Sequence, residues 1–164
     1  MRQLSFCASR RAAGARLAVL AVAAFPLVNL IAVTDAAASG SYAVIVNAAN
    51  DYKADDEAAA SLVRSLFLKE RLEWPDGTTV KPFASVGGGD VHSSFLQAVL
   101  SMTEAELAKH WLAVKQRTGR TAPREVSSSR LMLKLVAKYE GGLGVVEAAE
   151  ADGADGVRVL LTFP

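Results

Sequence analysis

Apolar residues are arranged along this chain in two ways, as short continuous runs and as positions three or four residues apart. A continuous run at 42–46 is typical of a strand that is buried on both faces of a sheet, and the mostly apolar runs at 143–146 and 157–161 predict two more buried strands. A run at 80–84 predicts a further strand, but Pro82 lacks a backbone N–H and should place that strand at an edge or a bend. The pattern therefore predicts four strands.

Apolar positions at helical spacing predict four helices. Thr103 and Glu106 form a capping box at the start of one helix. Asp90 is interpreted as the N-cap of another, and Ser127 or Ser128 as the N-cap of the last, which Gly141-Gly142 should end by taking the left-handed conformation. The positions that these helices are expected to bury are Leu62, Val63, Leu66 and Phe67; Val91, Phe95, Leu96, Val99 and Leu100; Leu107, Trp111 and Val114; and Leu131 or Met132, Leu135, Val136 and Tyr139.

The predicted strands are separated by the predicted helices along the chain. Trp74-Pro75-Asp76-Gly77 is typical of a tight turn, and 118–126 is interpreted as a loop that contains Gly119 and Pro123. Because the strand runs are mostly apolar, both faces of the sheet need a cover of helices. We therefore predict an α/β fold, a three-layer sandwich in which a mixed β-sheet is flanked by helices.

The first 38 residues have the features of an export signal. Four arginines precede an apolar run at 17–33, and small residues at 36–38 suit a signal peptidase. The apolar run is about 17 residues long, the lower limit for a membrane span, so an uncleaved N-terminal anchor is the alternative. In either case we expect 1–38 to be a signal peptide or anchor, and 39–164 to form one periplasmic or secreted domain.

Loss of the signal changes the charge of the protein. It removes four of the 18 basic residues and one of the 17 acidic ones, which leaves 14 against 16. We do not expect such a near-neutral domain, with no basic cluster, to bind nucleic acid or an anionic membrane. Cys7, the only cysteine, lies in the signal, so the exported domain has no disulfide and no thiolate zinc site. No cofactor is expected.

Several short segments occur in an order that resembles the phosphate-binding proteins of ABC importers, which are type II periplasmic binding proteins. The similar segments are 42–47, 66–69 before 74–77, 95–100, Trp111 with 118–120, 123–129 and 142–146. The resemblance covers about 120 residues and implies the α/β fold of that family. The family binds its ligand between two lobes, and this chain is long enough for one, so the resemblance implies a single-lobe relative.

The segment that corresponds to the family's anion-binding loop departs from the family pattern. The family's arginine, aspartate, serine and threonine fall here at Ser85, Gly87, Gly89 and Val91, when Phe95 is used to align the two. The resemblance therefore implies that the liganding side chains are lost. Backbone N–H groups at a glycine-rich helix start remain, and they can form a weak anion site.

The turn at 87–90 is the candidate ligand-binding site of this domain. The alternative is that its three glycines only form a flexible turn before a helix, with His92 and Ser93 solvated in the first turn. A serine cap between a strand and a helix can face the same cleft. The candidate ligand-binding residues are Gly88, Gly89, Asp90, His92, Ser93 and Ser128.

No set of residues in the sequence predicts catalysis or metal binding. Asp90, His92 and Ser93 are too close in sequence to form a hydrogen-bonded relay on a helix. His92 and His110 are 18 residues apart with no ligand spacing, and His110 is expected on a helix surface. A basic loop with Arg117, Arg120 and Arg124 is interpreted as solvated, with contact between an arginine and an acidic ligand or partner as the alternative.

These observations predict a non-enzymatic, exported protein that resembles phosphate-type solute-binding proteins and binds phosphate or another small oxyanion weakly. The alternative is a periplasmic protein–protein interaction or envelope-assembly module that has lost ligand binding. In that case a partly apolar face would meet another protein or a second copy of this chain.

Overall fold

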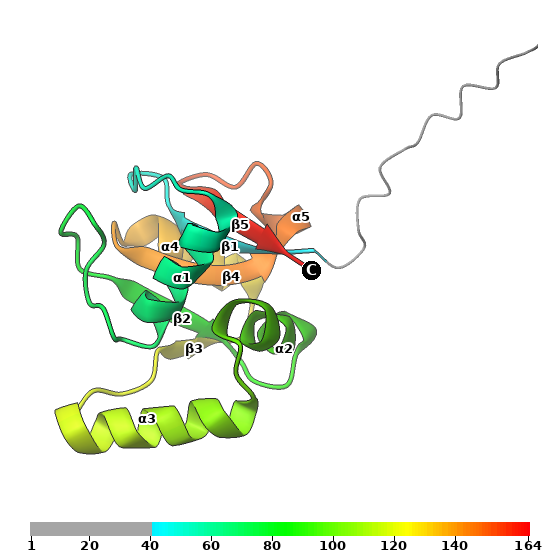
Figure 1. Ribbon diagram of the computed structural model, residues 1–164. Helices are drawn as coiled ribbons and strands as arrows, with labels where there is room; N and C mark the ends of the chain where they lie inside the picture. The colour runs from blue at the N-terminus through cyan, green and yellow to red at the C-terminus, as the bar shows by residue number, and fades with distance from the viewer. Residues whose placement is uncertain (1–40) are drawn as a thin grey trace, which may run out of the picture. The chain divides into compact units, whose positions relative to one another are not determined.

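A computed structural model describes residues 41–164 of the chain (Figure 1). The predicted signal peptide, 1–38, lies outside the described residues. The described part contains a five-stranded sheet in the order β3-β2-β4-β1-β5, with helices on both faces. The predicted α/β fold with a mixed, helix-flanked sheet is confirmed. In this part of the chain, no helix is long and apolar enough to cross a membrane.

An interior strand of the sheet, β1 (Tyr42–Asn47), is buried along its whole length. It runs antiparallel to β4 (Gly142–Glu147) and to β5 (Val157–Phe163), one on each side. Because successive side chains of a strand point to opposite faces, a strand that is apolar at every position can serve two cores. The three runs thus form the three adjacent strands β4, β1 and β5. The expectation of burial on both faces is wrong for β5, an edge strand that contains Arg158 and is fully buried only at Leu161 and Phe163.

The other two strands, β2 (Lys81–Ser85) and β3 (Arg124–Val126), are parallel to each other. The expectation that Pro82 places β2 at an edge is wrong, since β2 lies between β3 and β4. Lys81 donates its N–H toward β4, so the nitrogen of Pro82 faces the other side, where pairing with β3 begins only at Phe83. The proline therefore costs no ladder hydrogen bond. β3 itself lies in the segment that was predicted to be a loop.

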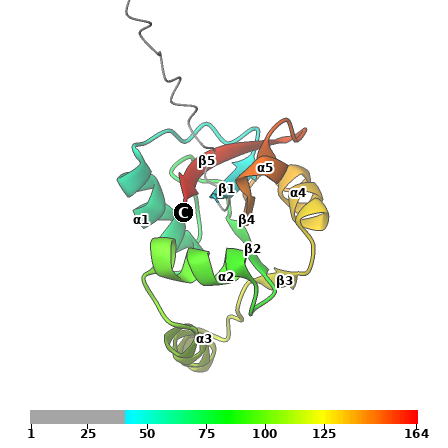
Figure 2. The ribbon, with the colours of Figure 1, turned by 90° about the vertical axis from the view of Figure 1, so that its right-hand side faces the viewer.

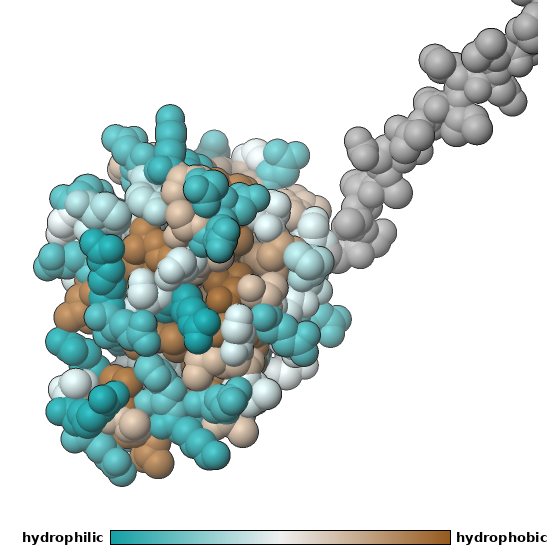
Figure 3. Space-filling view, in the orientation of Figure 1, coloured by the Kyte–Doolittle hydropathy of each residue, from teal (hydrophilic) through white to brown (hydrophobic). Residues whose placement is uncertain are grey.

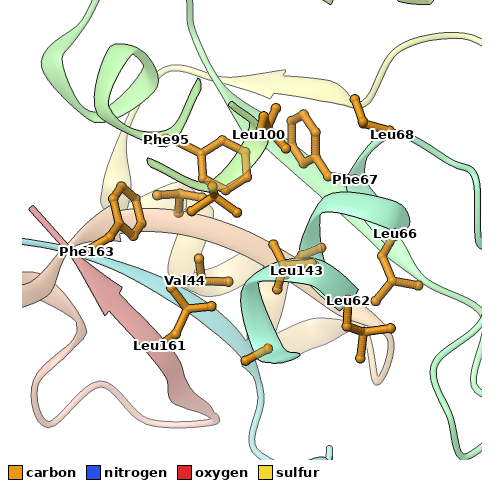
Figure 4. Close-up of a cluster of buried hydrophobic side chains, with 14 of the residues drawn as sticks. Val44, Leu62, Leu66, Phe67, Leu68, Phe95, Leu100, Leu143, Leu161 and Phe163 are labelled. Carbon is orange, nitrogen blue, oxygen red and sulfur yellow. The ribbon is translucent and has the colours of Figure 1, made fainter. Parts of the chain in front are cut away.

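One face of the sheet is covered by α1 (Asp56–Phe67), α2 (Asp90–Phe95) and a π-helical turn, η1 (Leu96–Leu100). Figure 4 shows side chains of these helices meeting alternate residues of the strands. The members of this larger core that it labels are Val44, Leu62, Leu66, Phe67, Leu68, Phe95, Leu100, Leu143, Leu161 and Phe163.

The opposite face is covered by α4 (Ser129–Lys138) and the short α5 (Ala148–Ala151), and Figure 2 shows the sheet between α1 and α4. Met132 and Val136 of α4 contact the strand residues that point away from the larger core, such as Ile45. Leu131 is exposed, so Met132 is the inward residue of the two alternatives.

The glycines after α4 are needed for close packing. The expectation that they end the helix in a left-handed conformation is wrong, because neither has a positive φ and the cap is the extended residue Tyr139. A Cβ atom on Gly141 would collide with the carbonyl oxygen of Thr79, and one on Gly142 would lie 2.7 Å from the carbonyl oxygen of Val136. Side chains are thus excluded where β4 starts beneath α4.

The longest helix, α3 (Glu104–Thr118), lies beyond the β3 edge of the sheet (Figures 1 and 2), and its Leu107 joins the larger core. Its predicted capping box between Thr103 and Glu106 is confirmed. Leu107 and Val114 are buried as predicted, whereas Trp111 is only half-buried.

Two polar contacts join the residues that follow α1 to the middle of α3 and to the loop after α3. His110 is half-buried, which contradicts its expected surface position, and its Nε2 lies 3.0 Å from the carbonyl oxygen of Leu68. The Nζ of Lys69 donates to the carbonyl oxygen of Thr121 at 2.6 Å. Burial and, to a smaller extent, the nearby Arg120 hold the pKa of Lys69 below its usual value.

Candidate functional site

The candidate site lies where two parallel strands end side by side. Ser85 of β2 is opposite Val126 of β3, so the carboxyl ends of both strands meet at one edge of the sheet. β2 leads to α2 on one face, and β3 leads to α4 on the other. Adjacent strands that lead to helices on opposite faces leave a crevice between the two connections, which is the usual ligand position in open α/β sheets.

The glycine turn starts α2 without help from a side chain. Gly88 has a φ of 86°, in the left-handed region that favours glycine. The expectation that Asp90 is the N-cap is wrong, because Gly89 occupies that position and Asp90 is the first helical residue. Gly89 has no side chain to accept a hydrogen bond, so the N–H groups of the first turn remain without a side-chain acceptor.

The start of α4 contributes hydroxyl groups to the same crevice. Ser128 is its N-cap, and its Oγ accepts a hydrogen bond from the N–H of Leu131 at 3.3 Å. This settles the choice between Ser127 and Ser128 in favour of the second. Ser127 is exposed beside it, and its hydroxyl is not the cap.

The crevice contains a small hollow of about 200 Å³, which we call the serine pocket. Its polar lining comes from Ser85, Ser127, Ser128 and Ser129 with Gly89 and His92, and three valines complete it. None of its lining residues is Lys, Arg, Asp or Glu. The pocket thus offers neutral donors with a single titratable side chain.

His92 is the buried polar residue at the centre of the site. Only 8% of its surface is exposed, and its Nε2 lies 2.7 Å from Oε2 of Glu104. The expectation of a solvated first turn is therefore wrong for His92. The sequence contains a signal for its burial, because His92 shares the helical phase of the apolar residues Phe95, Leu96 and Val99.

A second hollow of about 440 Å³ lies on the other side of His92, and we call it the glutamate pocket. Its polar lining includes Ser93, Gln97 and Glu104, above an apolar floor of Leu96 and Met102. Glu104 was not among the predicted site residues. It is the first residue of α3, 12 positions after His92, and no local pattern indicates that the two helices meet there.

The structure places five of the six predicted ligand-binding residues in the two pockets. Gly89, His92 and Ser128 line the serine pocket. Gly88, His92 and Ser93 line the glutamate pocket, whereas Asp90 lines neither of them.

The hydrogen bonds in this region do not form a catalytic relay. Glu104 pairs with His92, and Ser93 donates its hydroxyl to the carbonyl oxygen of Gly89 at 3.2 Å. Within residues 41–164, no three side chains of His, Cys, Asp or Glu converge in a way that could hold a metal ion. The basic loop residues Arg117, Arg120 and Arg124 are exposed and line neither pocket.

Comparison with solved structures places this domain among α/β folds of the type found in phosphate-binding proteins. An ABC-type phosphate transport receptor from Vibrio cholerae matches with 14% identity and a TM-score of 0.54, over 73% of this chain and 45% of the receptor. A possible phosphate binding protein from Planctomyces limnophilus is 17% identical, with a TM-score of 0.47, over 73% of this chain and 40% of that chain. No family model and no curated protein matches.

The chain thus spans less than half the length of the Vibrio cholerae receptor. This coverage fits the predicted correspondence to one lobe, and the predicted resemblance is confirmed as a likeness of fold.

Proposed function

We propose that residues 39–164 form an exported, non-enzymatic, solute-binding-like domain that binds phosphate or a similar small oxyanion weakly in the serine pocket. The observation that supports this proposal most is the position of that pocket. Four serines and the uncapped start of α2 meet at the carboxyl ends of two parallel strands. Hydroxyl and N–H groups are suitable donors for the oxygens of an oxyanion.

The charges around the pocket explain why the proposed affinity is weak. Charge-assisted hydrogen bonds are about twice as strong as neutral ones, and no Lys or Arg is among the lining residues. The carboxylate of Glu104 lies next to His92, and Asp90 follows Gly89 in the chain, so negative charge borders the pocket. We expect an affinity in the millimolar range.

Isothermal titration of the purified protein with phosphate and with sulfate tests this proposal. We expect weak binding heat that Ser127→Asp abolishes, because a carboxylate in the pocket repels an oxyanion. Ser127→Asn is the matched control, since it has nearly the same shape without the charge and should retain binding. Absence of heat at millimolar anion, or equal binding by the two variants, would contradict the proposal.

The exposed apolar residues do not support the alternative of an apolar interaction face. The large apolar side chains that are exposed in the described residues lie on five separate segments: Leu72, Val86, Leu112, Leu131 and Val159. Figure 3 shows apolar areas interspersed with hydrophilic residues on the face that it presents. The interaction or envelope-assembly module stays a prediction.

A further inference from the structure

The outer face of α4 carries a row of positive charges. Arg130, Lys134 and Lys138 occur at every fourth position, and all three are exposed. Residues four apart on a helix lie on the same side, about 6 Å from each other, so the three cations form one line. We call these three residues the basic row. The sequence does not show a basic cluster here because apolar residues separate the cations.

The basic row is not neutralised by the rest of the domain. Within the described residues, the ion pair that forms is His92–Glu104, so none of the three cations has a carboxylate within ion-pair distance. Residues 39–164 contain 14 basic and 16 acidic residues. The row is therefore a local concentration of positive charge on a domain whose total charge is slightly negative.

A groove of about 470 Å³ runs beside the basic row. Leu133 and Ala137 form its apolar floor, and Ala154 with Asp155 lines its other side. Ala154, Asp155 and Gly156 belong to the loop between α5 and β5, which packs closely against α4. Gly156 allows this close packing, because it has a φ of 77° and a Cβ there would lie 3.0 Å from the Cβ of Ala137. The groove is thus formed by the way the loop packs against α4.

We propose that the basic row and its groove bind an acidic helix of a partner protein. Such a helix can present carboxylates at every fourth position, the same spacing as the cations, and a small aliphatic side chain to the apolar floor. The row is one side chain wide and about 12 Å long, which matches a helix better than a membrane. The carboxylate of Asp155 would repel a continuous anionic surface such as a bilayer. A helix avoids this repulsion, because it can place a neutral residue opposite Asp155.

A synthetic helical peptide of about 16 residues, with glutamates at every fourth position and a leucine between them, is the probe for this proposal. Fluorescence anisotropy with the intact protein measures its binding. We expect Arg130→Glu, Lys134→Glu and Lys138→Glu together to weaken binding by about 100-fold or more, because three attractions become repulsions. The matched control reverses Lys109, Lys115 and Arg117, three exposed cations of α3, and should change binding by less than about threefold.

Further measurements distinguish the proposal from its rivals. Asp155→Asn should tighten peptide binding by about threefold, because it removes the one carboxylate that lines the groove. Equal loss of binding in both triple variants, or equal binding of a peptide with lysines in place of glutamates, would overturn the proposal. So would binding to phosphatidylglycerol vesicles that depends on the basic row, without binding to the peptide.

Discussion

The two helices α3 and α4 show how differently helices of one domain can be stabilised. α3 has 15 residues, a full capping box and two buried side chains. α4 has only 10 residues and a single serine cap, but Met132 and Val136 are almost fully buried between it and the sheet. Gly142 and Gly144 of β4 let the helix approach so closely that a Cβ on either would meet its atoms within 3.0 Å.

This difference shows that local signals and tertiary packing are separate sources of helix stability. Isolated helices of this length are marginal in water, so a helix in a protein depends mainly on the packing of its apolar face. α4 is part of the core, and its loss would expose the sheet. α3 adds Leu107 and the half-buried Trp111 to the larger core, and polar contacts of Lys69 and His110 support it. Since its side chains are less completely buried than those of α4, we expect it to open without unfolding of the sheet.

The largest expected effect comes from the core side chain of α4. Met132→Ala should lower the free energy of unfolding by about 3 kcal/mol, because it removes buried contacts and leaves a cavity against Gly144. Urea denaturation measures this. The neighbouring Leu131→Ala, at a position that is 41% exposed, should change the free energy by less than about 0.5 kcal/mol. Similar values for both variants would show that α4 does not pack as described.

The N-caps Thr103 of α3 and Ser128 of α4 give the most direct test of how the two helices differ. Thr103→Ala and Ser128→Ala should each cost about 1 kcal/mol, because each removes an N-cap acceptor. Hydrogen exchange should show the first loss only in the amides of α3 and the second in the whole sheet. A loss of protection across the sheet in Thr103→Ala would mean that α3 and the core unfold together.

The capping box of α3 should make the stability of that helix depend on pH. Hydrogen bonds from the backbone and side chain of Thr103 lower the pKa of Glu106. The ionised Glu106 therefore stabilises the fold above the ordinary glutamate pKa, and this contribution is lost as the pH falls through the lowered value. Exchange protection of α3 should exceed that of Glu106→Gln at neutral pH but not in acid. A difference that is constant with pH would contradict the cap geometry.

The smallest expected effect concerns Lys69, which follows α1 and binds the loop after α3 through the carbonyl oxygen of Thr121. Arg120→Gln should raise the pKa of Lys69 but leave it below the usual value, because burial is the larger cause of the shift. The unfolded chain holds the proton of the Lys69 ammonium group more tightly than the folded protein does. The free energy of unfolding should therefore rise as the pH rises through the folded-state pKa of Lys69. An NMR titration of Lys69 measures its pKa in the original protein and in the Arg120→Gln variant. An unchanged pKa in the variant would show that Arg120 lies farther from Lys69.

The sequence predicted those parts of the fold whose physics is local. Apolar runs located β1 and β4, since a strand inside a covered sheet needs apolar residues along its length, and a mostly apolar run located the edge strand β5. Thr103 and Glu106 located the start of α3, because a capping box is formed by residues three apart. In the candidate site, the glycine turn and a serine cap were found in the same way.

Other features depended on which segments meet in space. Pro82 is tolerated inside the sheet because the pairing of β2 with β3 begins only at the next residue, Phe83. Gly141 is needed because the backbone of Thr79 lies directly against it. The pairing of His92 with Glu104 and the division of the site into two pockets required α2 and α3 to be placed together.

The sequence by itself thus determined the type and order of most elements, the serine and threonine N-caps of α4 and α3, and the continuous burial of β1 and β4. Each of these follows from residues within one turn or one strand of each other. Only the tertiary structure decided which residues share a pocket, why the close glycines are needed and where the cations of α4 face. Those properties depend on contacts between segments that lie far apart in the chain, and no local pattern encodes the distance between them.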